Sequence, residues 1–154
     1  MKKIEVKLHH TVVAPLLDYL RQIVQAIPGE EPPFMEHLDD LDPEMQEMWS
    51  RELRELSQTD GEKFLQLFDK EFIETGTISL DEENASPVLR ACSAFRLKLR
   101  VHDLAAIPDE ILEQGDCSYE SMSNQEKRGY SAYLFLGALQ EIILEHLNLL
   151  NGSD

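Results

Sequence analysis

The candidates for nucleophilic catalysis in this sequence are two cysteines, Cys92 and Cys117, with His102 and His146 as candidate bases. Nucleophilic catalysis needs a thiolate held beside a histidine, and no sequence signature of such a site surrounds either cysteine. The seven glycines are scattered, so the chain also lacks a glycine-rich loop that could hold a phosphate group. These observations favour a protein without an enzymatic activity.

Four groups of residues contain side-chain types that bind metal ions. They are His9-His10, the acidic segment from Glu36-His37 to Asp42, His102-Asp103, and Glu141 with Glu145 and His146. Adjacent residues of a strand point to opposite faces, so the first two histidines cannot chelate one ion together. The acidic segment lacks the spacing, the glycine and the terminal glutamate of a calcium loop, and the last group lacks the H-E-x-x-H order. The sequence therefore predicts no metal site and no cofactor.

One polar pair is predicted between two helices. Arg96 follows the apolar Phe95 on the first helix, and Gln140 and Glu141 lie on the second, close to Gly137. A glycine at that position would let another backbone approach closely. A buried guanidinium needs several acceptors, and a carboxylate is the best bidentate one. We expect Arg96 to meet Glu141 or Gln140 as a structural contact, the alternative being that all of them lie at the solvent edge.

An acidic segment contains an apolar stripe at helical spacing. Residues 30–62 include twelve acids and two bases. The stripe, here called the Met/Trp stripe, consists of Met45, Met48, Trp49 and Leu53. Amphipathic helices usually pack such a stripe on the core, which is the favoured interpretation. The alternative is an acid-rimmed docking surface for a basic or amphipathic segment of another protein, because methionine surfaces adapt to partners and tryptophan is enriched at interface hot spots.

The net charge limits the classes of partner. Fourteen basic and 30 acidic residues give a formal charge of −16 at pH 7. Nucleic-acid binding needs a basic surface that releases counterions, so this charge predicts no binding to DNA, RNA or anionic membranes. No apolar run is long enough for a membrane span, and the first ten residues lack the apolar core of a signal peptide. We expect a soluble cytoplasmic protein whose partner is another protein.

The elements that would position these residues follow from periodicity and capping signals, in one domain covering residues 1–154. Thr11, Asp42, Asp60 and Asp81 are expected to begin helices as N-caps, with Pro43 in the first turn of the second. For the helix after Asp81 the alternative start is near Ser86, because Pro87 falls early in it. The expected elements are strands at 2–8 and 77–80, helices at 12–27, 43–57, 60–76 and 81–106, a stop at Pro28-Gly29, loops at 30–41 and 109–122, and one helical turn at Ile111-Leu112. Each strand leads directly into a helix. Because this strand-then-helix order occurs twice, in parallel fashion along the sequence, it favours pairing the two strands into a ribbon.

The last helix, residues 123–150, is predicted to be the centre of the core. Ser123 and Glu126 have the spacing of a capping box, and Asn151-Gly152 is a typical helix exit. Between Tyr133 and Leu139 the helix is apolar on nearly every side, which predicts burial all round. The predicted fold class is therefore mainly α: a bundle of about five helices around the C-terminal helix, with a small two-stranded β ribbon.

Three motifs follow one another in the second half of the chain: G-T-I-S-L-D at Gly76–Asp81, F-R-L-K-L at Phe95–Leu99 and Y-x-x-L-x-x-L-Q-E at Tyr133–Glu141. Their order and spacing resemble the strand, helix and final helix of a domain-of-unknown-function family of small bacterial proteins. The genes of that family often lie beside the gene of the ClpS protease adaptor. The resemblance implies a mostly helical fold and, through gene proximity, a link to protein turnover. It implies no activity or cofactor. The resemblance also implies no role for Arg100, because the family's other members lack this second arginine.

Together these patterns predict a non-enzymatic protein-interaction or regulatory module. A bundle this apolar could bury leftover surface against a copy of itself, so a homodimer is a further hypothesis. The alternative is a small-molecule-binding protein or enzyme with a pocket between the 81–106 and 123–150 helices.

Overall fold

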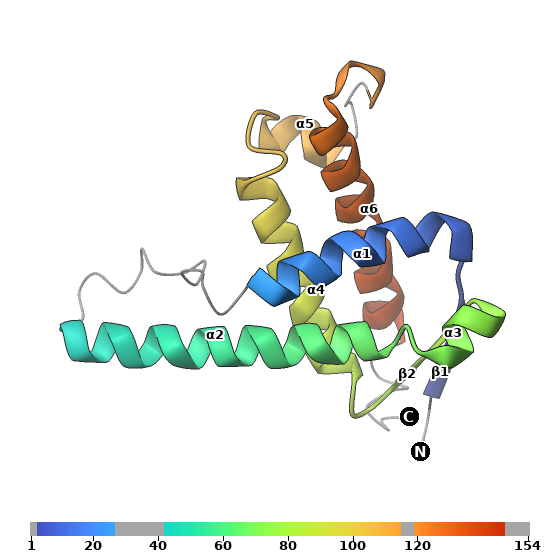
Figure 1. Cartoon of the computed structure of the whole chain (residues 1–154), viewed down its shortest axis with the longest axis horizontal. Helices are drawn as coiled ribbons and strands as arrows, with labels where there is room; N and C mark the ends of the chain where they lie inside the picture. Colours follow the sequence, from blue (N-terminus) through green and yellow to red (C-terminus); the bar gives the residue numbers. More distant parts are fainter. Residues whose placement is uncertain (1–2, 27–41, 115–118, 147–154) are drawn as a thin grey trace.

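The computed structural model describes residues 3–26, 42–114 and 119–146 (Figure 1). Its elements are β1 (Lys3–Lys7), α1 (His10–Ala26), α2 (Pro43–Gln66), α3 (Lys70–Thr75), β2 (Thr77–Asp81), α4 (Ala85–Val101), α5 (Asp109–Gln114), a 3₁₀ turn (Tyr119–Ser121) and α6 (Asn124–Glu145). The mainly helical fold with a small β ribbon is thus confirmed. The predicted stop at Pro28-Gly29, the loop at 30–41 and the helix exit at Asn151-Gly152 lie outside the described residues.

The two strands pair with each other, as predicted. They run antiparallel, with Val6 opposite Ile78 and Ile4 opposite Leu80. An antiparallel orientation is not determined by the repeated strand-then-helix pattern itself. Ile78 and Leu80 are buried, whereas the side chains of β1 are half-buried or exposed. The ribbon therefore has one strand that belongs to the core and one that covers it from outside.

The helix at the centre of the core is α4 and not α6. α4 packs against α2 on one side and against α6 on the other (Figure 1). Leu134 of α6 is 54% exposed, so the prediction that α6 is buried all round between Tyr133 and Leu139 is wrong. An apolar run shows that a helix can be buried, but the number of neighbouring helices decides how much of its circumference is covered.

α2 is one continuous helix where the sequence predicted two. Asp42 caps it as expected and accepts a hydrogen bond from the backbone N–H of Met45 at 2.9 Å. Asp60 was predicted to begin a new helix, but it lies inside α2 and is only 4% exposed. Its carboxylate binds the guanidinium of Arg90 on α4 through two contacts of 2.9 and 3.0 Å. The aspartate therefore joins two helices instead of ending one.

The glycine after this aspartate explains why the helix does not break there. A Cβ atom at Gly61 would lie 2.9 Å from Cγ2 of Val24 and 3.7 Å from the ring of Phe95. α1 and α2 contact each other in the structure. The absence of a side chain at position 61 thus serves this close packing, which offsets the weak helix propensity of glycine.

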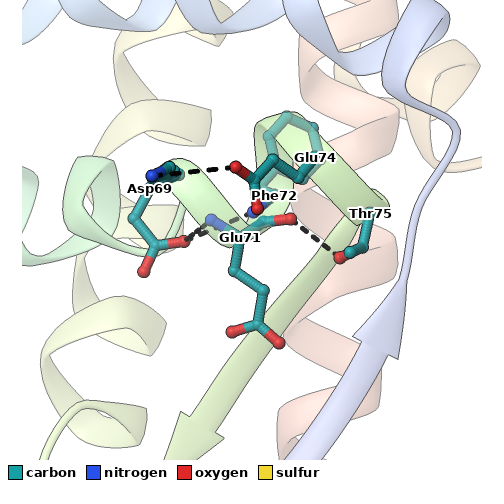
Figure 2. A network of polar contacts seen from close by, with 6 residues as sticks. Asp69, Glu71, Phe72, Glu74 and Thr75 are labelled. Carbon is teal, nitrogen blue, oxygen red and sulfur yellow. Dashed lines mark hydrogen bonds and ion pairs between the residues drawn. The ribbon is translucent and has the colours of Figure 1, made fainter.

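The predicted helix at 60–76 is divided after Gln66, and Asp69 begins α3. The Asp69 carboxylate accepts hydrogen bonds from the backbone N–H groups of Glu71 and Phe72 at 3.0 and 3.3 Å (Figure 2). At the other end of α3 the Thr75 hydroxyl donates to the Glu71 carbonyl at 2.7 Å. Gly76 ends α3 in the left-handed conformation, as predicted.

Two other predicted N-caps are wrong by a few residues. α1 begins at His10, and the carbonyl of His9 accepts the first helical hydrogen bonds, so Thr11 lies inside the helix. Asp81 ends β2, and its carboxylate accepts from the backbone N–H groups of Glu83 and Asn84 at 2.9 Å each, which forms a turn. α4 therefore starts at Ala85, which agrees with the alternative start near Ser86, and it ends at Val101 instead of residue 106. The helical turn at Ile111-Leu112 is present as α5.

Candidate functional site

The contact between α4 and α6 is built around Arg96. Its Nη1 donates a hydrogen bond to Oε1 of Gln140 at 2.8 Å, and Gln140 Nε2 donates to the Ser93 hydroxyl at 2.7 Å. The guanidinium carbon lies 4.2 Å from the centroid of the Tyr133 ring, within the range of a cation–π contact. Of the two alternatives drawn from the sequence, the structure contains Arg96 with Gln140. Glu141 is exposed to solvent.

Gly137 lets the guanidinium lie directly against α6. A Cβ atom at this position would be 3.3 Å from the guanidinium carbon of Arg96. The close approach expected at this glycine is thus made by a side chain and not by a backbone. The Nε atom of Arg96 is buried and has no hydrogen-bond partner among the described residues, and none of their carboxylates pairs with this guanidinium. In the described part of the chain, the acceptor of this guanidinium is thus the amide oxygen of Gln140.

Replacing Gln140 by alanine should lower the free energy of unfolding by about 1–2 kcal/mol, because the change leaves a part-buried guanidinium and a serine hydroxyl without their partner. Glu141→Ala is the matched control, one residue away on the exposed side, and should change stability by less than about 0.5 kcal/mol. Urea unfolding of the two variants measures the difference. Equal stabilities would show that the Arg96–Gln140 contact contributes nothing.

Cys92 is a core residue and not a nucleophile at neutral pH. Its side chain is fully buried on α4. Burial raises the pKa of the Cys92 thiol to about 12, although the nearby charge of Arg96 acts in the opposite direction. The candidate bases lie elsewhere: His102 is exposed at the end of α4, and Nδ1 of His146 contacts the Ile142 carbonyl at 2.9 Å. Cys117 lies outside the described residues.

Asp103, which the sequence indicated only as part of a possible metal-ligand group with His102, is a partly buried carboxylate. It follows α4 and lies against Gly129 of α6, where a Cβ atom would be 2.7 Å from the Cβ of Asp103. Its Oδ2 atom is buried without a hydrogen-bond partner among the described residues, and Oδ1 accepts only a long contact of 3.5 Å from Gln125. Desolvation raises the pKa of Asp103, while Gln125 and the charge of Arg128 oppose that rise. The glycine at 129 was the one available signal of this close packing.

The raised pKa of Asp103 predicts a pH dependence with a definite sign. A carboxyl group whose pKa is higher in the folded than in the unfolded chain stabilises the fold below the unfolded value, near 3.8. That stabilisation is lost as the pH rises through the folded value. Asp103→Asn should therefore be more stable than the wild type at pH 7, by less than about 1 kcal/mol because the group is partly solvated. At pH 3 the two proteins should unfold alike. A larger advantage of the variant at pH 3 than at pH 7 would contradict this assignment.

The predicted metal-ligand groups divide into those the structure describes and those it does not. Across residues 3–26, 42–114 and 119–146, no three histidine, cysteine, aspartate or glutamate side chains gather as they would around an ion. The ring of His10 packs on Phe72 with a centroid distance of 5.3 Å. Glu36, His37 and the two aspartates after them lie outside these ranges.

The Met/Trp stripe does not pack on the core where its side chains are described. Met45 and Met48 are 39% and 46% exposed, and Leu56 further along the same helix is 48% exposed. The side chains of Trp49 and Leu53 lie outside the described set. The favoured interpretation of a core-facing stripe is therefore wrong for both methionines. The reason is the length of α2, whose N-terminal half extends beyond α1, α4 and α6 (Figure 1).

None of the described helices is long and apolar enough to cross a membrane. Comparison of the chain with protein-family models, with curated proteins and with solved structures found no match.

Proposed function

We propose that this protein is a non-enzymatic interaction or regulatory module that binds another protein through the N-terminal half of α2. This half, Asp42 to Leu56, is called the α2 arm. The observation that supports the proposal is the exposure of three large apolar side chains on the arm, Met45, Met48 and Leu56, here called the exposed apolar set. Soluble proteins rarely gather such side chains on one exposed face unless a partner covers them.

The spacing of the exposed apolar set places its members on one side of the helix. With 100° of rotation per residue, Met45 and Leu56 differ by about 20°, and Met48 lies about 60° to the other side of Met45. These side chains therefore lie along one side of the arm. The N-cap at Asp42 and the proline after it keep the arm helical to its end. The arm therefore offers a preformed surface, which reduces the entropy that binding costs.

The cytoplasmic location and the lack of an enzymatic activity are parts of the same proposal. The high negative charge supports it, because it favours basic or neutral protein partners over nucleic acids and anionic membranes. The resemblance to the family encoded beside the ClpS adaptor supports a regulatory role in protein turnover. That support comes from association between genes and describes no mechanism.

A second candidate is a protein that binds a small anionic molecule between α4 and α6. The observation that favours it is Arg96, whose guanidinium has no carboxylate partner among the described residues in a chain with 30 acidic residues. Against it, Tyr133, Gly137 and Gln140 already contact the guanidinium. A rise in melting temperature with small carboxylates or phosphates that Arg96→Met abolishes would favour this candidate.

The experiment for the main proposal is affinity capture from cells with two matched variants. The first replaces the exposed apolar set by serine. The second places serine at Ile73 and Val101, which are exposed apolar residues outside the arm. Proteins captured by the wild type should be lost with the first variant and retained with the second. Retention by both variants, with the helical content intact, would contradict the proposal.

A further inference from the structure

The exposed face of the α2 arm carries negative charge alongside its apolar side chains. Glu44, Glu52 and Glu55 are all exposed. By helical rotation Glu52 falls between the members of the exposed apolar set, and the other two follow on the side of Met48. Arg51 is exposed and lies about 20° beyond Glu44, at the outer edge of this side, and Arg54 lies on the opposite side of the helix from Met45. The face from Leu56 to Glu44 is therefore apolar with three carboxylates, and its nearest base, Arg51, lies at its edge.

We propose that the occupant of this face is an amphipathic helix that carries lysine or arginine along the edges of its apolar stripe. The inference rests on the proposed function, since both require the α2 arm to be a docking surface. It is based on charge complementarity: basic side chains of the partner would pair with Glu44, Glu52 and Glu55 while its apolar side chains cover the exposed apolar set. Such pairing gives both orientation and faster association.

A helix fits this face better than an extended strand. The backbone N–H and C=O groups of the arm are used within α2 itself, so no free edge exists to which a strand could add. Side chains at successive spacings of three and four residues form ridges, and these ridges pack into the grooves of a second helix. The exposed positions Met45, Met48, Glu52 and Leu56 follow this spacing.

Two other occupants are disfavoured by their charge. In a symmetric pair of arms the acidic strip of one copy would face the same strip of the other, which places like charges together. The segment that precedes the arm in the sequence, residues 27–41, contains five carboxylates and no lysine or arginine. The homodimer predicted from the sequence would therefore have to use another surface. Sedimentation of the wild type and the serine variant distinguishes self-association through the arm.

The test uses the full chain and two synthetic amphipathic helical peptides. The peptides share their apolar positions and differ only at the flanks, which are lysine in one and glutamate in the other. Calorimetry should show one-to-one binding of the lysine peptide, at least about tenfold weaker in high salt than in low salt, and no binding of the glutamate peptide. Replacing the exposed apolar set by serine should abolish the binding.

A charge-reversal variant provides the second part of the test. Glu44→Lys with Glu52→Lys and Glu55→Lys should reverse the preference between the two peptides. The control carries the same change of net charge elsewhere, with lysine at the exposed positions Glu82, Glu120 and Glu141, and should keep the wild-type preference. Circular dichroism verifies that each variant is folded. Reversal by the control as well would show that only net charge acts and would overturn the inference.

The remaining outcomes separate this inference from the proposed function. If neither peptide binds while the serine variant still loses its captured proteins, the proposed function stands and the basic amphipathic partner is wrong. If sedimentation shows a dimer that the serine variant disrupts, the occupant is a second copy and the inference is overturned. If the serine variant keeps every captured protein, the α2 arm is not a docking surface and both proposals fail.

Discussion

Replacing Arg90 by methionine is expected to lower the free energy of unfolding by about 3 kcal/mol. Asp60 is buried, and Arg90 holds both of its carboxylate oxygens at 2.9 and 3.0 Å. Methionine keeps most of the apolar stem of Arg90 but leaves the carboxylate buried without its partner. Arg90 is half-exposed, so solvent access keeps the expected loss at the lower end of the range for buried pairs. Denaturant unfolding with a global fit of the midpoint measures it.

A double-mutant cycle distinguishes the ion pair from simple loss of packing. Asp60→Leu combined with Arg90→Met removes both charges, so the double variant should be more stable than Arg90→Met alone. The pKa of Arg90 is raised by its hydrogen bond and charge interaction with Asp60, against the effect of burial, which agrees with a favourable contact. A loss of less than about 0.5 kcal/mol in Arg90→Met would mean that the Asp60–Arg90 pair does not hold α2 to α4.

Gly76→Val is expected to destabilise the protein by about 3 kcal/mol, since two separate costs fall on one residue. Gly76 has a φ of 75°, a conformation that β-branched residues strongly avoid. A Cβ atom there would also lie 2.8 Å from the backbone carbonyl oxygen of Leu8, which is not the end of a flexible side chain. The Leu8 N–H donates to the Gly76 carbonyl at 2.7 Å, so the strain would act on the junction of β1, α3 and β2.

Gly137→Ala is the control for this prediction. Its new Cβ atom would meet the guanidinium of Arg96, the end of a long side chain, at 3.3 Å, and the residue has an ordinary helical backbone. The better helix propensity of alanine, up to about 1 kcal/mol, should offset the crowding and leave stability nearly unchanged. Thermal unfolding of both variants gives the comparison. Similar losses in the two would indicate that the backbone conformation at Gly76 is not the cause.

Local signals in the sequence identified several element boundaries correctly. Asp42 begins α2, the capping box of Ser123 and Glu126 begins α6, and Gly76 ends α3. Each of these signals acts through hydrogen bonds or dihedral angles within about four residues. The alternation of Ile4, Val6 and Leu8 indicated β1 for a similar reason, because the period of two is a property of the strand itself.

The same kind of local signal failed where distant residues competed with it. Asp60 followed by Gly61 reads as a helix boundary, yet Arg90 is thirty residues away from Asp60 and Val24 approaches Gly61 from another helix. Asp81 has the side chain of an N-cap but uses it in a turn before α4. In both cases the aspartate found the hydrogen-bond donors that it needs, and only the folded chain decides which donors lie within reach.

The candidate site illustrates the same division. Gln140 and Glu141 differ by one residue, which is 100° of helix rotation, so sequence alone left both as partners of Arg96. Packing of α4 on α6 selected Gln140 and left Glu141 in solvent. The sequence showed that the stripe with Met45 and Met48 lies on one face of an amphipathic helix. It did not show which other helices would pack against that face.

By itself the sequence determined that this protein is mainly helical, where several helices start and stop, and that its charge is strongly negative, because periodicity, capping and composition act over short range. Only the tertiary structure decided that α4 is the central helix, that Asp60 pairs with Arg90, and that the α2 arm exposes Met45 and Met48. These features depend on which elements become neighbours. Whether an apolar side chain is buried depends on the residues that pack against it, and those residues lie far away along the chain.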